Sequence, residues 1–208
     1  MKSTILASLE GSNVTDPDRI GEATPEYIRP SPRLTYDDYC QIPPGHQRYE
    51  LIGGAIRVVP SPSVSHQEAS KRLLMALARW VEGHGLGQVY CAPLDVVLSE
   101  YDVVQPDLVY VSKERSSIIK EANIWGTPDL VVEILSPGTA RWDQEIKRQL
   151  YTRFGVRELW LVDPQAHTVE VATLADGALL TSQAYCVGTT LTSPLLPGFA
   201  LDVERLFA

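Results

Sequence analysis

Two acidic residues stand inside segments whose other residues are typical of buried β-strands. Asp107 lies in "PDLVYV" and Glu133 lies in "PDLVVEIL", each among β-branched and apolar neighbours. Because side chains alternate between the faces of a strand, Asp107 shares a face with Val109 and Val111. An unpaired buried carboxylate costs on the order of several kcal/mol. A divalent cation bound by both acids would offset this cost, and Mg²⁺ prefers such oxygen ligands.

Each acid also has a simpler explanation when it is taken alone. A carboxylate at a strand end can reach water or pair with an arginine. The two acids together are more informative, because pairing of their strands can bring both side chains to one place. Asp129 and Asp95 are weaker candidates, since Asp129 opens its strand and a turn or cap role explains it.

A lysine lies on the apolar stripe of the helix that the segment "WDQEIKRQLYTRFG" predicts. Lys147, Leu150, Tyr151 and Phe154 follow one another at i, i+3, i+4 and i+7. In one interpretation the stem of Lys147 packs while its ammonium group reaches solvent. In the other, Lys147 lies beside the two carboxylates and faces a scissile phosphate or a water molecule.

The elements around these residues predict an α/β fold built on a mixed central sheet. A helix over 65–83, opened by a capping-box pattern at Ser65 and Glu68, is followed by strands over 88–99, 103–112 and 128–135. The helix over 142–155 and a strand over 157–163 complete the order α-β-β-β-α-β, with a parallel pair expected across the last helix. Hairpins over 48–59 and 167–187 extend this core at its N- and C-terminal sides.

The bulk composition limits the classes of protein to which the chain belongs. A chain of 208 residues suffices for one domain, which we expect over 34–208, after a flexible extension over 1–33 that lacks periodicity. The net charge of −8 argues against a strong, diffuse attraction to nucleic acid, but it leaves room for a local basic groove. Three separated cysteines and the absence of a long apolar run indicate a cytoplasmic protein without a membrane partner.

Several stretches together resemble the PD-(D/E)XK nuclease superfamily, and most closely its Uma2 branch of restriction endonuclease-like proteins. The similar text is "YELIGGAIRVVPSPSVSHQ", "APLDVVLSEYDVVQPDLVYVS", "PDLVVEILSPGTARWDQEIKRQLYTRFGVRELWLVDP" and "LTSPLLPGFAL". The resemblance runs from about residue 34 to the end of the chain. It implies a restriction-endonuclease-like core and an Mg²⁺-dependent endonuclease that hydrolyses phosphodiester bonds of DNA, with Mn²⁺ as a substitute for Mg²⁺.

The resemblance also implies a role for each central residue. Asp107 and Glu133 would be metal ligands, with the carbonyl oxygen of Ile134 as a third, and the metal would lower the pKa of an attacking water. The usual lysine follows the glutamate by two positions, where this chain has Leu135. Lys147 would then be the catalytic lysine, relocated to the next helix.

Further candidates surround this set, each with an alternative explanation. Glu50 resembles an extra acid of the branch that completes the catalytic and metal site, but it also fits a cross-strand ion pair. His66 is a candidate for contact with the site or with substrate, but it also fits a polar helix start. The candidates for phosphate contact, which also fit a solvated helix face, are Lys71, Arg72, Arg141, Arg148 and Arg153.

Two functions compete at this point. The first is a metal-dependent DNA endonuclease, for which a homodimer is a natural expectation because a single cleft of this kind cuts one strand. The second is a binding or assembly protein on a nuclease fold, with weak catalysis or none. The net charge of −8 favours the second, whereas convergence of Asp107, Glu133 and Lys147 in one cleft would favour the first.

Overall fold

The computed structural model of the chain describes residues 32–43, 47–136 and 143–208. The chain divides into two units, Met1–Pro32 and Arg33–Ala208, and the helices and strands named below belong to the second. The extension predicted over residues 1–33 lies outside the described residues, apart from its last two positions.

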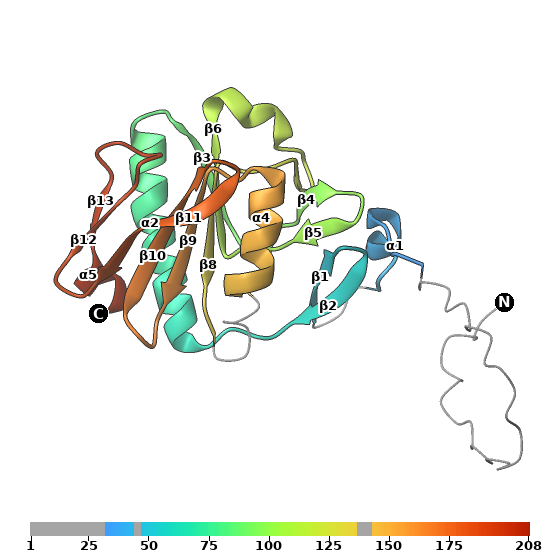
Figure 1. The fold of residues 1–208 in the computed structure, drawn as a ribbon, viewed down its shortest axis with the longest axis horizontal. Helices are drawn as coiled ribbons and strands as arrows, with labels where there is room; N and C mark the ends of the chain where they lie inside the picture. Colours follow the sequence, from blue (N-terminus) through green and yellow to red (C-terminus); the bar gives the residue numbers. More distant parts are fainter. Residues whose placement is uncertain (1–31, 44–46, 137–142) are drawn as a thin grey trace, which may run out of the picture. The chain divides into compact units, whose positions relative to one another are not determined.

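A six-stranded mixed sheet forms the centre of the unit Arg33–Ala208, with strand order β11-β10-β9-β8-β6-β3 (Figure 1). The parallel pair is β8 with β9, and each other neighbouring pair is antiparallel. The crossover from β8 to β9 contains α4, as predicted for a strand–helix–strand unit. The strands are β3 (Gly87–Cys91), β6 (Leu108–Ser112), β8 (Leu130–Ile134), β9 (Glu158–Asp163), β10 (Thr168–Ala175) and β11 (Ala178–Cys186).

A second sheet has the order β2-β1-β5-β4-β7. It begins with the predicted hairpin, whose Gly53–Gly54 turn has φ values of 61° and 82° that favour glycine. Its strands are β1 (Arg48–Ile52), β2 (Ala55–Val59), β4 (Val96–Ser99), β5 (Asp102–Val104) and β7 (Ile124–Trp125).

The prediction of continuous strands over 88–99 and 103–112 is wrong. Each segment is broken in two: β3 and β6 pair in the central sheet, whereas β4 and β5 pair in the second sheet. Pro93 lies in the first break and Pro106 in the second. Since proline has no backbone N–H to donate to a ladder, both breaks fall where the sequence weakens strand pairing.

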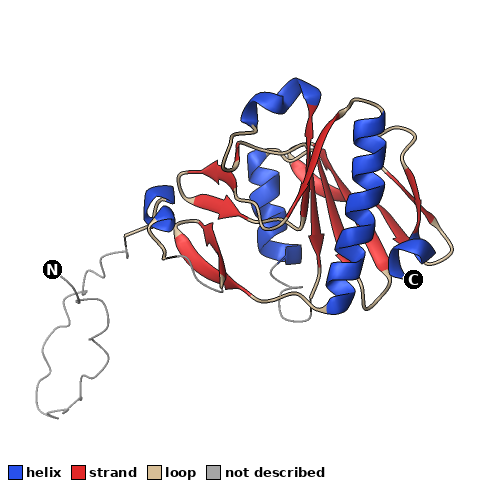
Figure 2. Cartoon of the chain, turned by 180° about the vertical axis from the view of Figure 1, so that it is seen from behind, coloured by secondary structure: helices blue, strands red, loops and turns tan. Residues whose placement is uncertain are grey.

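Helices cover both faces of the central sheet. α2 (Val64–Gly83) lies on one face and α4 (Arg148–Phe154) on the other (Figures 1 and 2). The N-cap of α2 is Ser63, whose hydroxyl accepts from the His66 backbone N–H, so the predicted capping box at Ser65 is wrong. A π-helical segment, η2 (Asp143–Lys147), leads into α4, which ends at Gly155. The remaining elements are α1 (Tyr36–Cys40), η1 (Lys113–Ile118), β12 (Thr190–Thr192), β13 (Ala200–Asp202) and α5 (Val203–Phe207).

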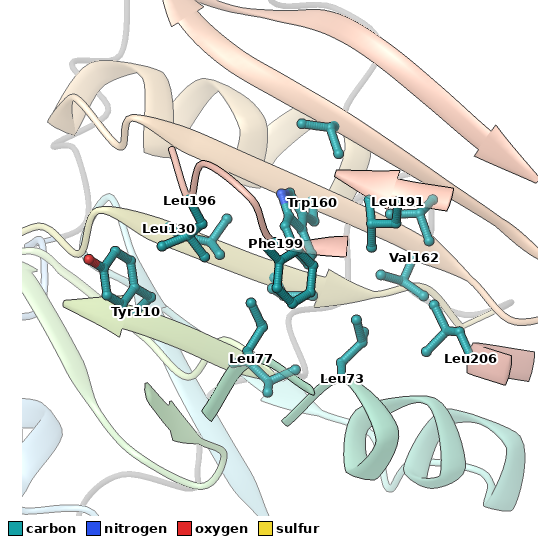
Figure 3. Packing of buried hydrophobic residues seen from close by; sticks show 14 of the residues in the cluster. Leu73, Leu77, Tyr110, Leu130, Trp160, Val162, Leu191, Leu196, Phe199 and Leu206 are labelled. Carbon is teal, nitrogen blue, oxygen red and sulfur yellow. The ribbon is translucent and has the colours of Figure 1, made fainter. Parts of the chain in front are cut away.

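Two apolar clusters follow from the alternation of side chains along the central strands. On the α2 face, Leu73 and Leu77 pack with residues of β6, β8 and β9 and with the C-terminal segment (Figure 3). On the α4 face, Leu150 pairs with strand residues that include Val109 and Val131. Full burial of such a side chain stabilises the fold by about 1.5–3 kcal/mol. No helix of the described residues is long and apolar enough to span a membrane.

Candidate active site

The pairing of β6 with β8 brings Asp107 and Glu133 to the lining of one pocket. The register pairs Leu108, the first residue of β6, with Val132, and Asp107 and Glu133 are the next residues along the two chain segments. Glu133 alternates with Val131 and Leu135, which lie on the α4 face, whereas Asp107 precedes the first residue of β6. The backbone N–H of Ile134 donates to Asp107 Oδ2 over 2.7 Å and fixes this carboxylate.

Lys147 reaches the same place from the π-helical segment that precedes α4. Its Nζ lies 3.1 Å from both carboxylate oxygens of Glu133 and 2.9 Å from Glu50 Oε1. Lys147 is only 5 % exposed, Glu133 3 % and Glu50 2 %. The ammonium group therefore ends among carboxylates and not in solvent, and a π-helical turn at this point is a feature often found at functional sites.

Tyr151 supplies another contact to the same carboxylate. It lies one helical turn after Lys147, is fully buried, and donates its hydroxyl proton to Glu133 Oε1. The predicted apolar stripe of this helix therefore carries two polar groups, those of Lys147 and Tyr151, to one acid. Both groups donate hydrogen bonds to the Glu133 carboxylate.

Glu50 comes from β1 of the second sheet and completes the cluster. The backbone N–H of Gln105 donates to Glu50 Oε1 over 3.1 Å, in addition to the Lys147 contact. Arg57 is the direct cross-strand neighbour of Glu50 in the β1–β2 hairpin.

His66 contacts the site from the first turn of α2. Its Nε2 lies 3.2 Å from Asp107 Oδ2, and the residue is 8 % exposed. The buried Nδ1 has no hydrogen-bond partner among the described residues, and the same holds for Oε1 of Gln105. Unsatisfied buried polar atoms are costly, so their occurrence at one pocket indicates a place prepared for a polar ligand or water.

These side chains line one pocket, together with residues that the sequence did not single out. The missed residues include Arg48, Arg57 and Gln105. The signal for the two arginines was available: Arg48 precedes Glu50 by two positions on one strand face, and Arg57 is opposite Glu50. The full lining is Arg48, Glu50, Arg57, Val59, Pro60, Ser61, Pro62, His66, Gln105, Asp107, Glu133, Ile134, Ser136 and Lys147.

The other basic candidates that the structure describes do not line this pocket. Arg148 binds Glu170 and Thr181 on β10 and β11, because consecutive helical residues such as Lys147 and Arg148 point about 100° apart. Arg141 lies outside the described residues. The ion pairs of the remaining candidates join Lys71 and Arg72 to Glu68, and Arg153 to Asp102.

A tyrosine–carboxylate network supports the strand that carries Glu50. The Tyr39 hydroxyl donates to Asp95 Oδ1 over 2.9 Å, and Gln105 Nε2 donates to the same oxygen over 2.8 Å. Burial, and then the neighbouring Asp95 carboxylate, raise the pKa of Tyr39 well above its ordinary value. The tyrosine thus remains a donor at neutral pH, and Asp95 has a structural role.

The chemistry of the donor set fits a hard divalent cation. Asp107 and Glu133 offer carboxylate oxygens and Ile134 lines the same pocket, a combination suited to Mg²⁺ or Mn²⁺. Across the described ranges no group of three or more Asp, Glu, His or Cys side chains is already arranged around a metal position. The Lys147 ammonium is the cation nearest to Glu133, so metal ligation by Glu133 requires a shift of Lys147.

Comparisons with known proteins show the family and the fold of the chain. A family model described as "Uma2: Putative restriction endonuclease" matches residues 36–204. Among solved structures, the chain is similar to a protein described as a "putative nuclease belonging to DUF820" from Anabaena variabilis ATCC 29413, with a TM-score of 0.70 and 19 % sequence identity. That similarity covers 84 % of this chain and 97 % of the other, and it supports the restriction-endonuclease-like fold. No curated protein matches the sequence.

Proposed function

The chain belongs to the Uma2 family of putative restriction endonucleases, and we propose that it hydrolyses phosphodiester bonds of DNA with the help of a divalent cation. Asp107 and Glu133 bind that cation, with Glu50 and the carbonyl oxygen of Ile134 completing the set of oxygen ligands. Mg²⁺ is the proposed cofactor and Mn²⁺ its substitute, because both favour oxygen ligands.

One observation carries the proposal: three buried charged side chains from separate elements meet at a pocket. Lys147 contacts both Glu50 and Glu133, while Asp107 accepts from the backbone N–H of Ile134 and lines the same pocket. Buried charges of this kind contribute little to stability relative to apolar packing, so their convergence indicates function. The buried acids Asp129 and Glu158 do not line this pocket. Each accepts hydrogen bonds from backbone or side-chain donors in its own part of the fold.

The metal, when bound, supplies a Lewis acid that polarises a phosphoryl oxygen and makes a water molecule more acidic. The Ile134 N–H and His66 hold Asp107 in one orientation. Tyr151 does the same for Glu133. Lys147, held near Glu133 by Glu50, donates hydrogen bonds to the negative charge that develops on the phosphate in the transition state.

The test is cleavage of supercoiled plasmid DNA in Mg²⁺, in Mn²⁺ and in chelator. We expect metal-dependent nicking by the wild-type protein and none in chelator. Asp107→Asn should abolish cleavage, and Lys147→Met should lower its rate by two or more orders of magnitude, or about 3 kcal/mol of transition-state stabilisation. Asp163→Asn is the matched control, since among the described residues the Asp163 side chain accepts hydrogen bonds from backbone N–H groups of its own turn at the end of β9 and does not line the pocket.

A folded wild-type protein that cleaves no DNA in either metal would contradict the proposal. A nuclease-fold binding or assembly protein would then be the better account. The product also tests the number of chains involved: a single cleft yields nicked circles first, whereas a homodimer that cuts both strands yields linear DNA directly.

A further inference from the structure

Arg48 lies at the junction of three adjoining pockets. It lines the active-site pocket together with Glu50 and Lys147. It also lines a second pocket along α2, which shares His66 and Asp107 with the first. The third pocket contains Arg48 with residues of α1 and β1. A chain-like ligand that runs from either flanking pocket into the active-site pocket would therefore pass Arg48.

The charge environment of Arg48 differs from that of most other basic side chains. Within residues 32–43, 47–136 and 143–208, no hydrogen bond, ion pair or ring contact joins the half-buried Arg48 side chain to a partner. Carboxylates neutralise the other basic side chains at many positions: Lys71 and Arg72 by Glu68, Arg115 and Arg157 by Asp129, Arg148 by Glu170 and Arg153 by Asp102.

The position of Arg48 on β1 places its charge next to the reaction centre. Arg48 and Glu50 are two residues apart and so share a strand face, with their Cα atoms about 7 Å apart. Glu50 does not need Arg48, because Lys147 and the Gln105 backbone N–H bind its carboxylate. A guanidinium group without a carboxylate partner, at the edge of a pocket that holds three acids, is suited to an anionic ligand.

We propose that Arg48 is a substrate-positioning residue that binds a backbone phosphate next to the scissile one. This inference rests on the proposed function and deepens it, since it predicts a substrate that extends through both flanking pockets. The guanidinium group offers two parallel N–H donors to the phosphate oxygens. It also offsets the negative potential of Glu50, Asp107 and Glu133, which otherwise repels a polyanion.

The test compares oligonucleotide binding by wild type, Arg48→Gln and Arg48→Lys over a range of salt concentrations. Fluorescein-labelled DNA is titrated in Ca²⁺, with a gel to verify that it remains intact, and the affinity is measured by anisotropy. Arg48→Gln should raise Kd at least tenfold for every sequence and reduce the slope of log K against log salt by about 1. Arg48→Lys keeps the charge and should restore the slope, but only part of the affinity.

Arg79→Gln is the matched control, because Arg79 is an exposed arginine of α2 that lines neither the active-site pocket nor the two pockets beside it. It should bind DNA as the wild type does. The melting temperature of Arg48→Gln should equal that of the wild type, and its Mn²⁺ affinity should be equal or higher because a positive charge near the acids is removed. Weaker DNA binding by this variant then does not arise from a loss of folding or of metal binding.

The outcomes separate this inference from the proposed function. Equal Kd and equal salt slope in wild type and Arg48→Gln would overturn the inference, even if the protein cleaves DNA. Weaker binding by Arg48→Gln, with no cleavage by any variant, would support the inference and overturn the nuclease function. A wild-type protein that binds no DNA at all would overturn the inference as well.

Discussion

At the scale of single residues, Lys147 holds the position where a cation is required. Its ammonium group lies within 3.1 Å of Glu133 and Glu50, both of which are buried. Lys147→Met keeps the packed stem but leaves two uncompensated carboxylates. In chelator it should lose about 3–5 kcal/mol of unfolding free energy, the usual cost of breaking a buried ion pair. Thermal melts with and without Mn²⁺ test this expectation.

Mn²⁺ should raise the melting temperature of Lys147→Met more than that of the wild type, because the added cation replaces the missing charge. Lys113→Met serves as the control, since Lys113 is an exposed lysine remote from the active-site pocket. If Lys147→Met melts like the wild type in chelator and gains nothing from Mn²⁺, the ammonium group does not neutralise this site.

The sequence predicted several residues of this pocket from one kind of signal. That signal is a charged residue at a position where the surrounding pattern is typical of a buried apolar side chain. Asp107, Glu133 and Lys147 each show it, within a strand or on a helical stripe. Arg48 and Arg57 do not, because their exposure depends on which sheet the β1–β2 hairpin joins. The hairpin register, which places both arginines near Glu50, was the sequence signal that could have identified them.

At the scale of elements, Arg148, the residue after Lys147, connects the start of α4 to the central sheet. Arg148 binds Glu170 on β10. Burial raises the pKa of Glu170, but hydrogen bonds from Thr181 and Arg148 outweigh it and hold the pKa below its usual value of 4.5. A carboxyl whose pKa is lower in the folded state stabilises the fold at neutral pH. This stabilisation is lost as the pH falls through the lowered pKa.

Glu170→Gln should therefore melt below the wild type at about pH 7, and the difference should shrink toward about pH 3. Thermal melts of both proteins over this pH range measure it. A difference that stays constant down to the lowest pH would mean that the charge of Glu170 does not contribute.

The start of β3 depends on a close approach of two backbones. Gly87 has φ +150°, and a Cβ atom there would lie 2.1 Å from the Val111 carbonyl oxygen of β6. Gly155, at the end of α4, also has positive φ, but nothing lies within 4 Å of its Cβ position. Gly155→Ala should cost about 1 kcal/mol of unfolding free energy, from backbone strain alone. Urea denaturation should show a loss several times larger for Gly87→Ala, and equal losses would contradict the close approach.

The order of elements was predictable because the strands and helices differ clearly in hydrophobic period. Both hairpins and the parallel β8–β9 pair follow the predicted order. The split of β3 from β4 and of β5 from β6 was not predicted, since apolar residues continue on both sides of Pro93 and Pro106. Only the pairing partners show that each proline marks a change of sheet.

At the scale of the whole molecule, the C-terminal segment is part of the core and not an appendage. Leu206 of α5 is fully buried in the cluster on the α2 face, where Figure 3 shows it beside Leu73 and Val162. Leu206→Ala should lower the free energy of unfolding by about 2–5 kcal/mol. Leu180→Ala is the control, because Leu180 on β11 is 54 % exposed. Urea denaturation that shows equal losses for both variants would exclude this role of the C-terminal segment.

The net charge of −8 is a poor guide to whether this chain can bind DNA, because it sums charges at positions with different roles. Surface ion pairs use many of the basic side chains, while Arg48 and Arg57 line the pocket that contains the acids. Local arrangement, and not the sum of charges, therefore decides whether a polyanion can enter this pocket.

The measurement that tests the central claim most directly is calorimetric titration of the protein with Mn²⁺. The wild type should bind Mn²⁺ at one site, and Asp107→Asn should weaken binding at least tenfold without lowering the melting temperature. Asp107→Asn retains an oxygen that accepts from the Ile134 N–H, so its fold should persist. Asp163→Asn should bind Mn²⁺ as the wild type does. Equal Mn²⁺ affinity in wild type and Asp107→Asn would contradict the assignment of Asp107 as a metal ligand, and with it the account of this pocket as a metal-dependent active site.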